Sequence, residues 1–265
     1  MASNEQQARE AANSFRVKHS LGILPIKDVF ELVHLAIGID VFSIEAAEEE
    51  HGLTMLDPAT GRRVIVVATT PNPMRQRSSV AHELGHLLRG DLDSIGQLAP
   101  GERSPAEICA DAFARHLLLP IEAVRHRLPG RARVTVNDLS DLVQEFEVSP
   151  VIAAIQLRSA RRVAADAFEE WKALSSRHLA AQFGWLSQYD SLVESSLKPR
   201  APQLLMRRAV TGYQAGVLGI AELSAWYGQT ADSLREELGE PLEPAGLDRA
   251  SASRDRLPPF PVRST

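Results

Sequence analysis

The sequence predicts an α+β fold in which a small antiparallel sheet is followed by helices. Three segments between residues 39 and 69 are rich in apolar and β-branched residues and have the length of strands. From residue 78 onward the pattern turns helical, with serine and proline at helix starts. The apolar share of 44% is ordinary for a globular protein and too high for a disordered chain.

The first part of the chain is expected to hold two helices and three strands. Polar helix formers and closing glycines place the helices at 5–18 and 25–36. The strands are predicted at 39–44, 52–57 and 62–69. Because Asp-Pro-Ala-Thr-Gly lies between the last two strands, these two are expected to form a hairpin.

Two helices follow the sheet region, which Pro71 and Pro73 are expected to end. The first is predicted at 78–88 and closes at Arg89-Gly90. The second begins at Ser104-Pro105, where serine can cap the helix and proline suits its first position. It is expected to end before Pro120.

The chain beyond Pro120 is expected to be helical, and it divides by composition. The pair 137–146 and 150–162, joined by a short turn, has the look of a helix-turn-helix. Further helices are predicted at 166–197, 203–214, 221–227 and 231–238. We therefore expect an α+β domain at 1–120, a helix-turn-helix-like module at 121–165, a C-terminal helical region at 166–240, and a tail at 241–265 whose composition predicts disorder.

Charge and cysteine content narrow the class of protein. A formal net charge of −5 gives no electrostatic reason to bind nucleic acid or an anionic membrane. One cysteine, Cys109, allows no intrachain disulfide and suits a reducing compartment. No apolar stretch reaches the length of a signal peptide or a membrane span. A cytoplasmic location and no membrane partner are therefore expected.

The segment Val80-Ala-His-Glu-Leu-Gly-His86 predicts a metal site. On a helix, His82 and His86 lie about 40° apart and about 6 Å along the axis, so both imidazoles can reach one ion. Glu83 is rotated by about 100° from His82 and can act on a water molecule without being a ligand. The histidines point away from the apolar stripe of Val80, Leu84, Leu87 and Leu88, which argues against ordinary core residues.

A catalytic metal site usually needs a third protein ligand, and Glu107 on the next helix is one candidate. The same residue fits a capping box with Ser104, in which its side chain would only bond back to the helix start. Asp91 and Glu102 compete as ligands, and His116 is a poorer candidate because it lies about 180° from Glu107. From spacing alone the third ligand stays open.

Four neighbours of these residues have expected roles of their own. Asp111 would lie one turn after Glu107 and would accept a hydrogen bond from a ligand histidine. Cys109 is expected to be a small buried residue. Arg75 and Arg77 can orient a substrate, although solvated charges are the commoner role for such arginines.

The segments VAHELGHLL and EICADAFARHLLLP together resemble the ImmA/IrrE family of metallopeptidases. Glu107, Ala110, Asp111, Phe113 and the Leu-Leu-Pro ending at Pro120 fit the family's second motif. The resemblance extends from about residue 23 to residue 158. It implies a zincin-like domain, with His82, His86 and Glu107 as metal ligands and Glu83 as the catalytic residue.

The resemblance also implies a function, a metal-dependent, gluzincin-like endopeptidase holding Zn²⁺, Mn²⁺ or another divalent ion. Glu83 would take a proton from metal-activated water, and the strand at 64–69 would hold the peptide by edge pairing. Family members are cytoplasmic regulators, several of which act on helix-turn-helix repressors of stress or mobile-element genes. The alternatives are a non-cleaving regulator with a structural or sensory metal site, and the toxin of a toxin–antitoxin pair.

The helix-turn-helix-like module is not expected to recognise a DNA sequence. The first six positions of its second helix, 150–155, hold no side chain that can hydrogen-bond to a base edge. Nearby arginines allow only weak phosphate contact. We expect the module to pack on the catalytic domain or to dock a protein substrate.

Overall fold

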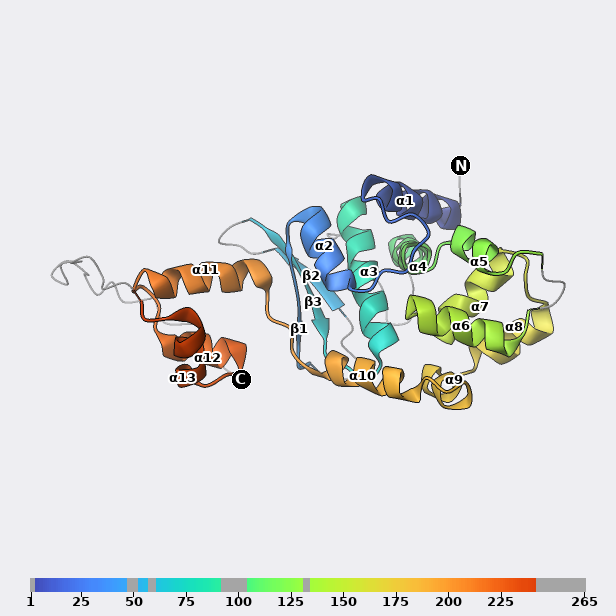
Figure 1. Cartoon of the computed structure of the whole chain (residues 1–265). Coiled ribbons are helices and arrows are strands. Elements are labelled where there is room, and N and C mark those ends of the chain that lie inside the picture. Colours follow the sequence, from blue (N-terminus) through green and yellow to red (C-terminus); the bar gives the residue numbers. More distant parts are fainter. Residues whose placement is uncertain (1–2, 47–51, 57–60, 92–103, 131–133, 242–265) are drawn as a thin grey trace, which may run out of the picture. The chain divides into compact units, whose positions relative to one another are not determined.

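The structure is a computed structural model that describes residues 3–46, 52–56, 61–91, 104–130 and 134–241. It forms two compact units, Met1–Leu204 and Leu205–Thr265. The first unit contains the sheet and the helices up to α10 (Leu186–Leu197). The second contains most of α11 (Gln203–Gln214) together with α12 (Ile220–Tyr227) and α13 (Ala231–Leu238) (Figure 1). The finer division predicted at residues 120 and 165 stays a prediction. The predicted tail lies outside the described residues from residue 242 onward.

The predicted α+β class is confirmed, but the sheet is mixed and not antiparallel throughout. Its strands, β1 (Asp40–Ile44), β2 (Gly52–Leu56) and β3 (Arg63–Ala68), follow the order β1-β3-β2. β2 and β3 pair antiparallel, as predicted, whereas β1 pairs with β3 in parallel. The all-antiparallel prediction was wrong because β3 takes the centre, where a continuous run of buried apolar residues, Ile65 to Val67, is favoured.

The helix with the two histidines, α3 (Pro73–Arg89), begins five residues earlier than predicted. The side chain of Asn72 caps it by accepting a hydrogen bond from the backbone N–H of Arg75. Pro73 therefore starts the helix in addition to ending the sheet region, because proline tolerates the first helical position. Gly90 ends α3 with φ 70°, as the Arg-Gly pair predicted.

The helix α4 (Pro105–Leu118) starts at its predicted cap and packs against α3 and against α1 (Asn4–Lys18). The shorter α2 (Val29–Ile37) begins after Asp28, which caps it, and so four residues later than predicted. Figure 1 shows α3 between the sheet and α2 on one side and α4 on the other. Because both sides of α3 are covered, most of its residues before Leu87 are buried, and Arg75, Ser78, Ser79 and His82 stay partly or fully exposed.

The helices after α4 belong to the same unit up to residue 204. The predicted pair is present as α6 (Val136–Phe146) and α7 (Pro150–Ser159), and α7 packs on α4, which agrees with the first of the two roles expected for the module. The side chain of Gln156, fully buried in α7, donates a hydrogen bond to the carbonyl of Leu119 at the end of α4. A short helix, α5 (Ile121–Arg127), links the two parts.

The predicted long helix at 166–197 is three helices, α8 (Ala165–Lys172), α9 (Ser176–Gln182) and α10 (Leu186–Leu197). Ser175 caps α9, and Gly184 with φ 80° separates it from α10. The last three helices match their predicted positions within one residue and are α11 (Gln203–Gln214), α12 (Ile220–Tyr227) and α13 (Ala231–Leu238).

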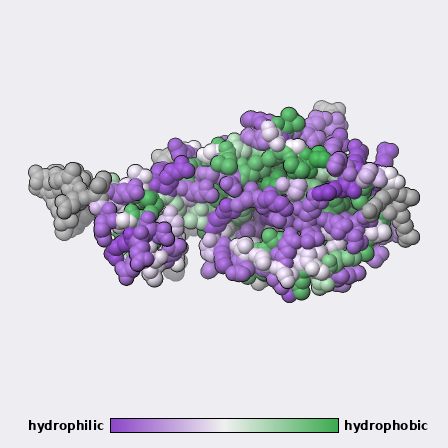
Figure 2. Space-filling view, viewed as in Figure 1, coloured by the Kyte–Doolittle hydropathy of each residue, from purple (hydrophilic) through white to green (hydrophobic). Residues whose placement is uncertain are grey.

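Polar and apolar side chains are mixed on the surface. The face in Figure 2 is largely polar, with apolar areas over the first unit. Val17, Leu24 and Leu35 are each more than two-thirds exposed, and scattered residues of this kind are ordinary surface. Among the described helices, none combines the length and hydrophobicity that crossing a membrane requires.

Candidate metal centre

Helix α3 brings His82 and His86 onto its side that faces α4. Their rings lie one turn apart, and the two Nε2 atoms are 3.0 Å from each other. His86 is only 1% exposed, although it points away from the apolar stripe. The apolar stripe identified from the sequence faces the other side of α3, but α4 covers the histidines as well.

A glycine between the histidines allows the two helices to approach closely. A Cβ atom at Gly85 would stand 3.1 Å from Cδ1 of Phe113 and 3.3 Å from Cα of Ala110. Even a methyl group at this position would require these neighbours in α4 to move by a few tenths of an ångström. The absence of a side chain at Gly85 therefore lets Glu107, at the start of α4, reach the histidines.

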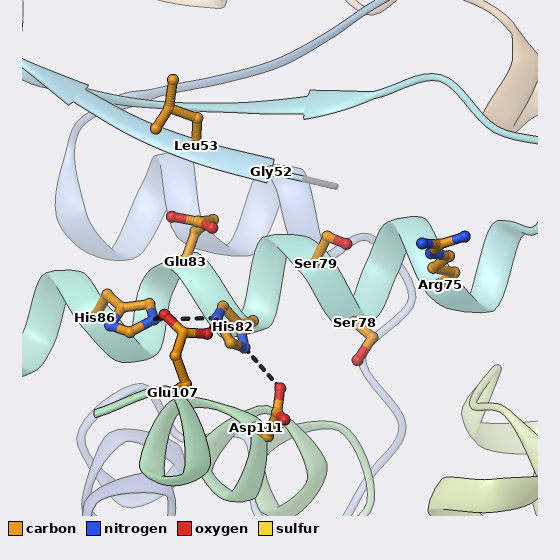
Figure 3. A pocket seen from close by; sticks show the side chains of 10 residues that line it. All are labelled: Gly52, Leu53, Arg75, Ser78, Ser79, His82, Glu83, His86, Glu107 and Asp111. Atoms are coloured by element: carbon orange, nitrogen blue, oxygen red, sulfur yellow. Dashed lines mark hydrogen bonds and ion pairs between the residues drawn. The ribbon is translucent and has the colours of Figure 1, made fainter. Parts of the chain in front are cut away.

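The Glu107 carboxylate completes a cluster of three donor groups. Its Oε2 lies 3.2 Å from Nε2 of His82, and its Oε1 lies 3.2 Å from Nε2 of His86. One ligand atom from each of the three residues lies within 4.8 Å of the others. Ser104 still caps α4 through the backbone N–H of Glu107, while the Glu107 side chain turns to the histidines. Figure 3 shows the three side chains converging between α3 and α4.

Two aspartates form hydrogen bonds with the Nδ1 atoms of the histidine rings, on the side away from Glu107. Asp111 Oδ1 lies 2.8 Å from Nδ1 of His82, and Asp91 Oδ1 lies 2.9 Å from Nδ1 of His86. Each imidazole therefore directs Nε2 towards the shared point. Asp91, expected as a competing ligand, lies on the outer side of His86 and also accepts from Nε of Arg89 at 2.8 Å. Glu102, the other competitor, lies outside the described residues.

The pKa of Asp91 reflects this position. Partial burial on its own raises the pKa of the carboxyl group, but hydrogen bonds from His86 and Arg89 lower it below its usual value. Asp91 is thus held as an anion beside the ring of His86. An anionic acceptor at Nδ1 fixes the tautomer in which Nε2 has a free lone pair.

Glu83 lies on the opposite side of the cleft, against the sheet. Its side chain is 7% exposed, and Oε2 accepts a hydrogen bond from Oγ1 of Thr54 in β2 at 2.7 Å. Thr54 was not identified from the sequence, where its only signal is its place in a strand. The cleft between these groups has a volume of about 410 Å³ and is lined by Gly52, Leu53, Arg75, Ser78, Ser79, His82, Glu83, His86, Glu107 and Asp111.

A comparison with family models matches residues 35–158 to the IrrE N-terminal-like domain of the peptidase family M78. This part of the chain belongs to that family. The matched residues include α3, α4 and both motifs from which the resemblance was drawn. In the comparison with curated proteins, no sequence matches this chain.

Membership of the peptidase family supports metallopeptidase activity, a divalent metal ion and a protein substrate. The donor set of the IrrE-like domain fits such an ion. Two imidazole nitrogens and a carboxylate oxygen suit Zn²⁺ and related divalent metals, and they leave room for a water or a substrate.

The structure also shows where the two arginines before the histidines and the single cysteine lie. Arg75 lines the cleft, which agrees with a role towards substrate. Arg77 is buried, lies 3.0 Å from Oε2 of Glu147 and donates to the carbonyl groups of 26 and 27, so the expectation of a solvated charge is wrong. Burial lowers the pKa of its guanidinium. Cys109 is 2% exposed, as predicted.

Proposed function

We propose that this protein is a metal-dependent endopeptidase that cleaves a peptide bond in a protein substrate. His82, His86 and Glu107 are the ligands, and Glu83 is the general base. The observation behind this proposal is the convergence of the three donor atoms within 4.8 Å in a cleft that Glu83 also lines. Zn²⁺ is the first choice of ion, with Mn²⁺ or another divalent metal as the alternative.

Glu83 has the position that a general base requires. When bound, a divalent ion supplies Lewis-acid chemistry, which polarises the scissile carbonyl and makes water a stronger acid. Glu83 takes the proton from the attacking water and then passes it to the leaving amine. Asp111 and Asp91 do not touch the substrate in this scheme. They keep the Nδ1 protons of His82 and His86 in place.

The strand that holds the substrate is β2, not the segment 64–69 expected from the sequence. β3, which contains that segment, pairs with β1 on one side and with β2 on the other, so its backbone groups are already used. Among the described strands, β2 pairs with β3 only, and Gly52 and Leu53 of β2 line the cleft. An extended peptide added to the outer edge of β2 would cross the cleft in front of Glu83.

The substrate we propose is a helix-turn-helix transcriptional repressor. This choice rests on the resemblance to the ImmA/IrrE family, several of whose members act on such repressors of stress or mobile-element genes. A non-cleaving regulator would bind the same partner and leave it intact. A toxin would act on a different target.

Co-expression tests the proposal. The full chain, as wild type or Glu83→Gln, is expressed with the helix-turn-helix proteins encoded beside it, and intact-mass spectrometry detects fragments. Wild type should produce two fragments from one partner, and Glu83→Gln should leave the same partner whole. Stable binding without fragments would favour the non-cleaving regulator, and equal cleavage by both chains would exclude Glu83 as the base.

A further inference from the structure

The orientation of the Glu83 carboxylate is set by the sheet as well as by its own helix. The backbone of α3 places the side chain at the cleft, but rotation about its last bond leaves the carboxylate plane undefined. Oε2 of Glu83 accepts from the hydroxyl of Thr54 at 2.7 Å. This distance is typical of a strong hydrogen bond between a hydroxyl and a charged oxygen.

A glycine two residues earlier in β2 makes room for the same carboxylate. A Cβ atom at Gly52 would stand 3.3 Å from both Cγ and Oε1 of Glu83, and 3.4 Å from Cγ1 of Val67. Figure 3 shows Gly52 directly beside Glu83. Residues two apart in a strand share one face of the sheet, so Gly52 and Thr54 meet the carboxylate together. The hydroxyl fixes Oε2, and the missing side chain leaves space at Oε1.

We propose that Gly52 and Thr54 are positioning residues for hydrolysis, which act by holding Glu83 in one orientation. This inference rests on the proposed role of Glu83 as general base. A base transfers a proton efficiently only when its oxygen points at the donor, and neighbouring groups must supply that order in advance. Because both residues belong to the strand proposed to bind the substrate, one element aligns the peptide and the base.

A purely structural role for Thr54 predicts different behaviour. A hydroxyl that only satisfies a buried carboxylate would contribute to folding and leave turnover of the folded enzyme unchanged. A positioning hydroxyl affects kcat, leaves KM and metal content alone, and is replaceable by another hydroxyl. Serine at position 54 keeps the donor, and valine keeps the shape without it.

The test compares Thr54→Val, Thr54→Ser and Gly52→Ala in the full chain loaded with Zn²⁺. The substrate is a quenched fluorescent peptide that spans the bond cleaved in the co-expression experiment. Metal content, thermal midpoint, kcat and KM are measured for each variant and for Glu83→Gln. Gly52→Ala keeps the Thr54 hydroxyl and crowds the carboxylate, so it gives an independent reading if Thr54→Val folds poorly.

The expected result is a fall in kcat of roughly 10-fold or more for Thr54→Val, with KM and metal content unchanged. Thr54→Ser should regain most of the wild-type kcat, and Gly52→Ala should lower kcat without loss of metal. Wild-type kcat in folded Thr54→Val or in Gly52→Ala would overturn the positioning role while the role of Glu83 stands. Equal hydrolysis by wild type and Glu83→Gln would instead overturn the proposed function and this inference with it.

Discussion

Two buried histidine clusters meet the same helix, α4, and they differ in how their ring nitrogens are used. At the start of α4, His82 and His86 lie against Glu107. Near its end, His116 lies 2.8 Å from Oε1 of Glu5 through Nε2, and 3.1 Å from Nε2 of Gln156 through Nδ1. His86 and His116 are equally buried, each 1% exposed, and each lies beside a carboxylate.

The two clusters differ in whether their ring nitrogens converge on one point. The degree of burial of the histidines does not reveal this difference. Both nitrogens of His116 have their own partners on separate helices, so the ring is fully satisfied by protein. His82 and His86 each use Nδ1 for an aspartate, while both Nε2 atoms point at one place together with Glu107. A histidine with two partners of its own is a structural residue, and histidines whose nitrogens converge on one point with a carboxylate are candidates for metal ligands.

Removal of a ligand carboxylate should have the largest effect. Saturation with metal at about 100 times its dissociation constant stabilises a folded protein by roughly 2.7 kcal/mol, which raises the thermal midpoint by about 5–10 °C. Glu107→Ala should lose this metal-dependent rise, since only two ligands remain. Differential scanning fluorimetry with Zn²⁺ and with a chelator measures it. Glu5→Gln is the matched control and should keep the full rise.

Replacement of an aspartate that bonds to Nδ1 of a proposed ligand histidine should have an intermediate effect on metal binding. Asp111→Asn removes the charge that holds Nδ1 of His82 and leaves every ligand in place. Loss of such partners weakens metal binding by roughly 10–100-fold. Competition with a fluorescent zinc chelator gives the affinity. An affinity unchanged from wild type would show that Asp111 does not orient His82.

The smallest effect is expected at the second cluster and depends on pH. The hydrogen bond from His116, together with Arg115, lowers the pKa of Glu5 from 4.5 to about 2 despite partial burial. Because the folded pKa is the lower one, this carboxylate stabilises the fold above pH 4.5 and loses that contribution as pH falls towards 2. Glu5 is half exposed, so the contribution is small.

The thermal midpoints of wild type and Glu5→Gln, followed from neutral to acid pH, check this prediction. The wild type should be the more stable chain at neutral pH, and the difference should shrink through the range from pH 4.5 to 2. A constant difference across that range would mean that the ionisation of Glu5 is not coupled to folding.

The sequence predicted the elements around the cleft better than the way in which they pair. His82, Glu83 and His86 were found because helical spacing alone brings both histidines to one side and turns Glu83 by about 100° from His82. The third ligand stayed open, since the Ser104–Glu107 spacing fits a cap and a ligand equally, and only tertiary packing turns the side chain. The start of α3 was predicted too late because a proline such as Pro73 can either end a strand or occupy the first position of a helix.

Strand pairing and buried polar contacts are the parts that local signals could not determine. Turn residues predicted the β2–β3 hairpin, but no local pattern shows which edge of β3 receives β1. Thr54 and Arg77 owe their roles to partners 29 and 70 residues away, Glu83 and Glu147. Contacts of that range depend on the folded chain, and periodicity does not report them.

Metal analysis of three purified chains, wild type, His82→Ala and His116→Gln, tests the central claim most directly. Each is loaded with Zn²⁺ and desalted, and the ions per chain are counted by elemental mass spectrometry. The account predicts one ion per chain in wild type and His116→Gln, and a site largely emptied in His82→Ala. A full site in His82→Ala, or an empty one in folded His116→Gln, would contradict it.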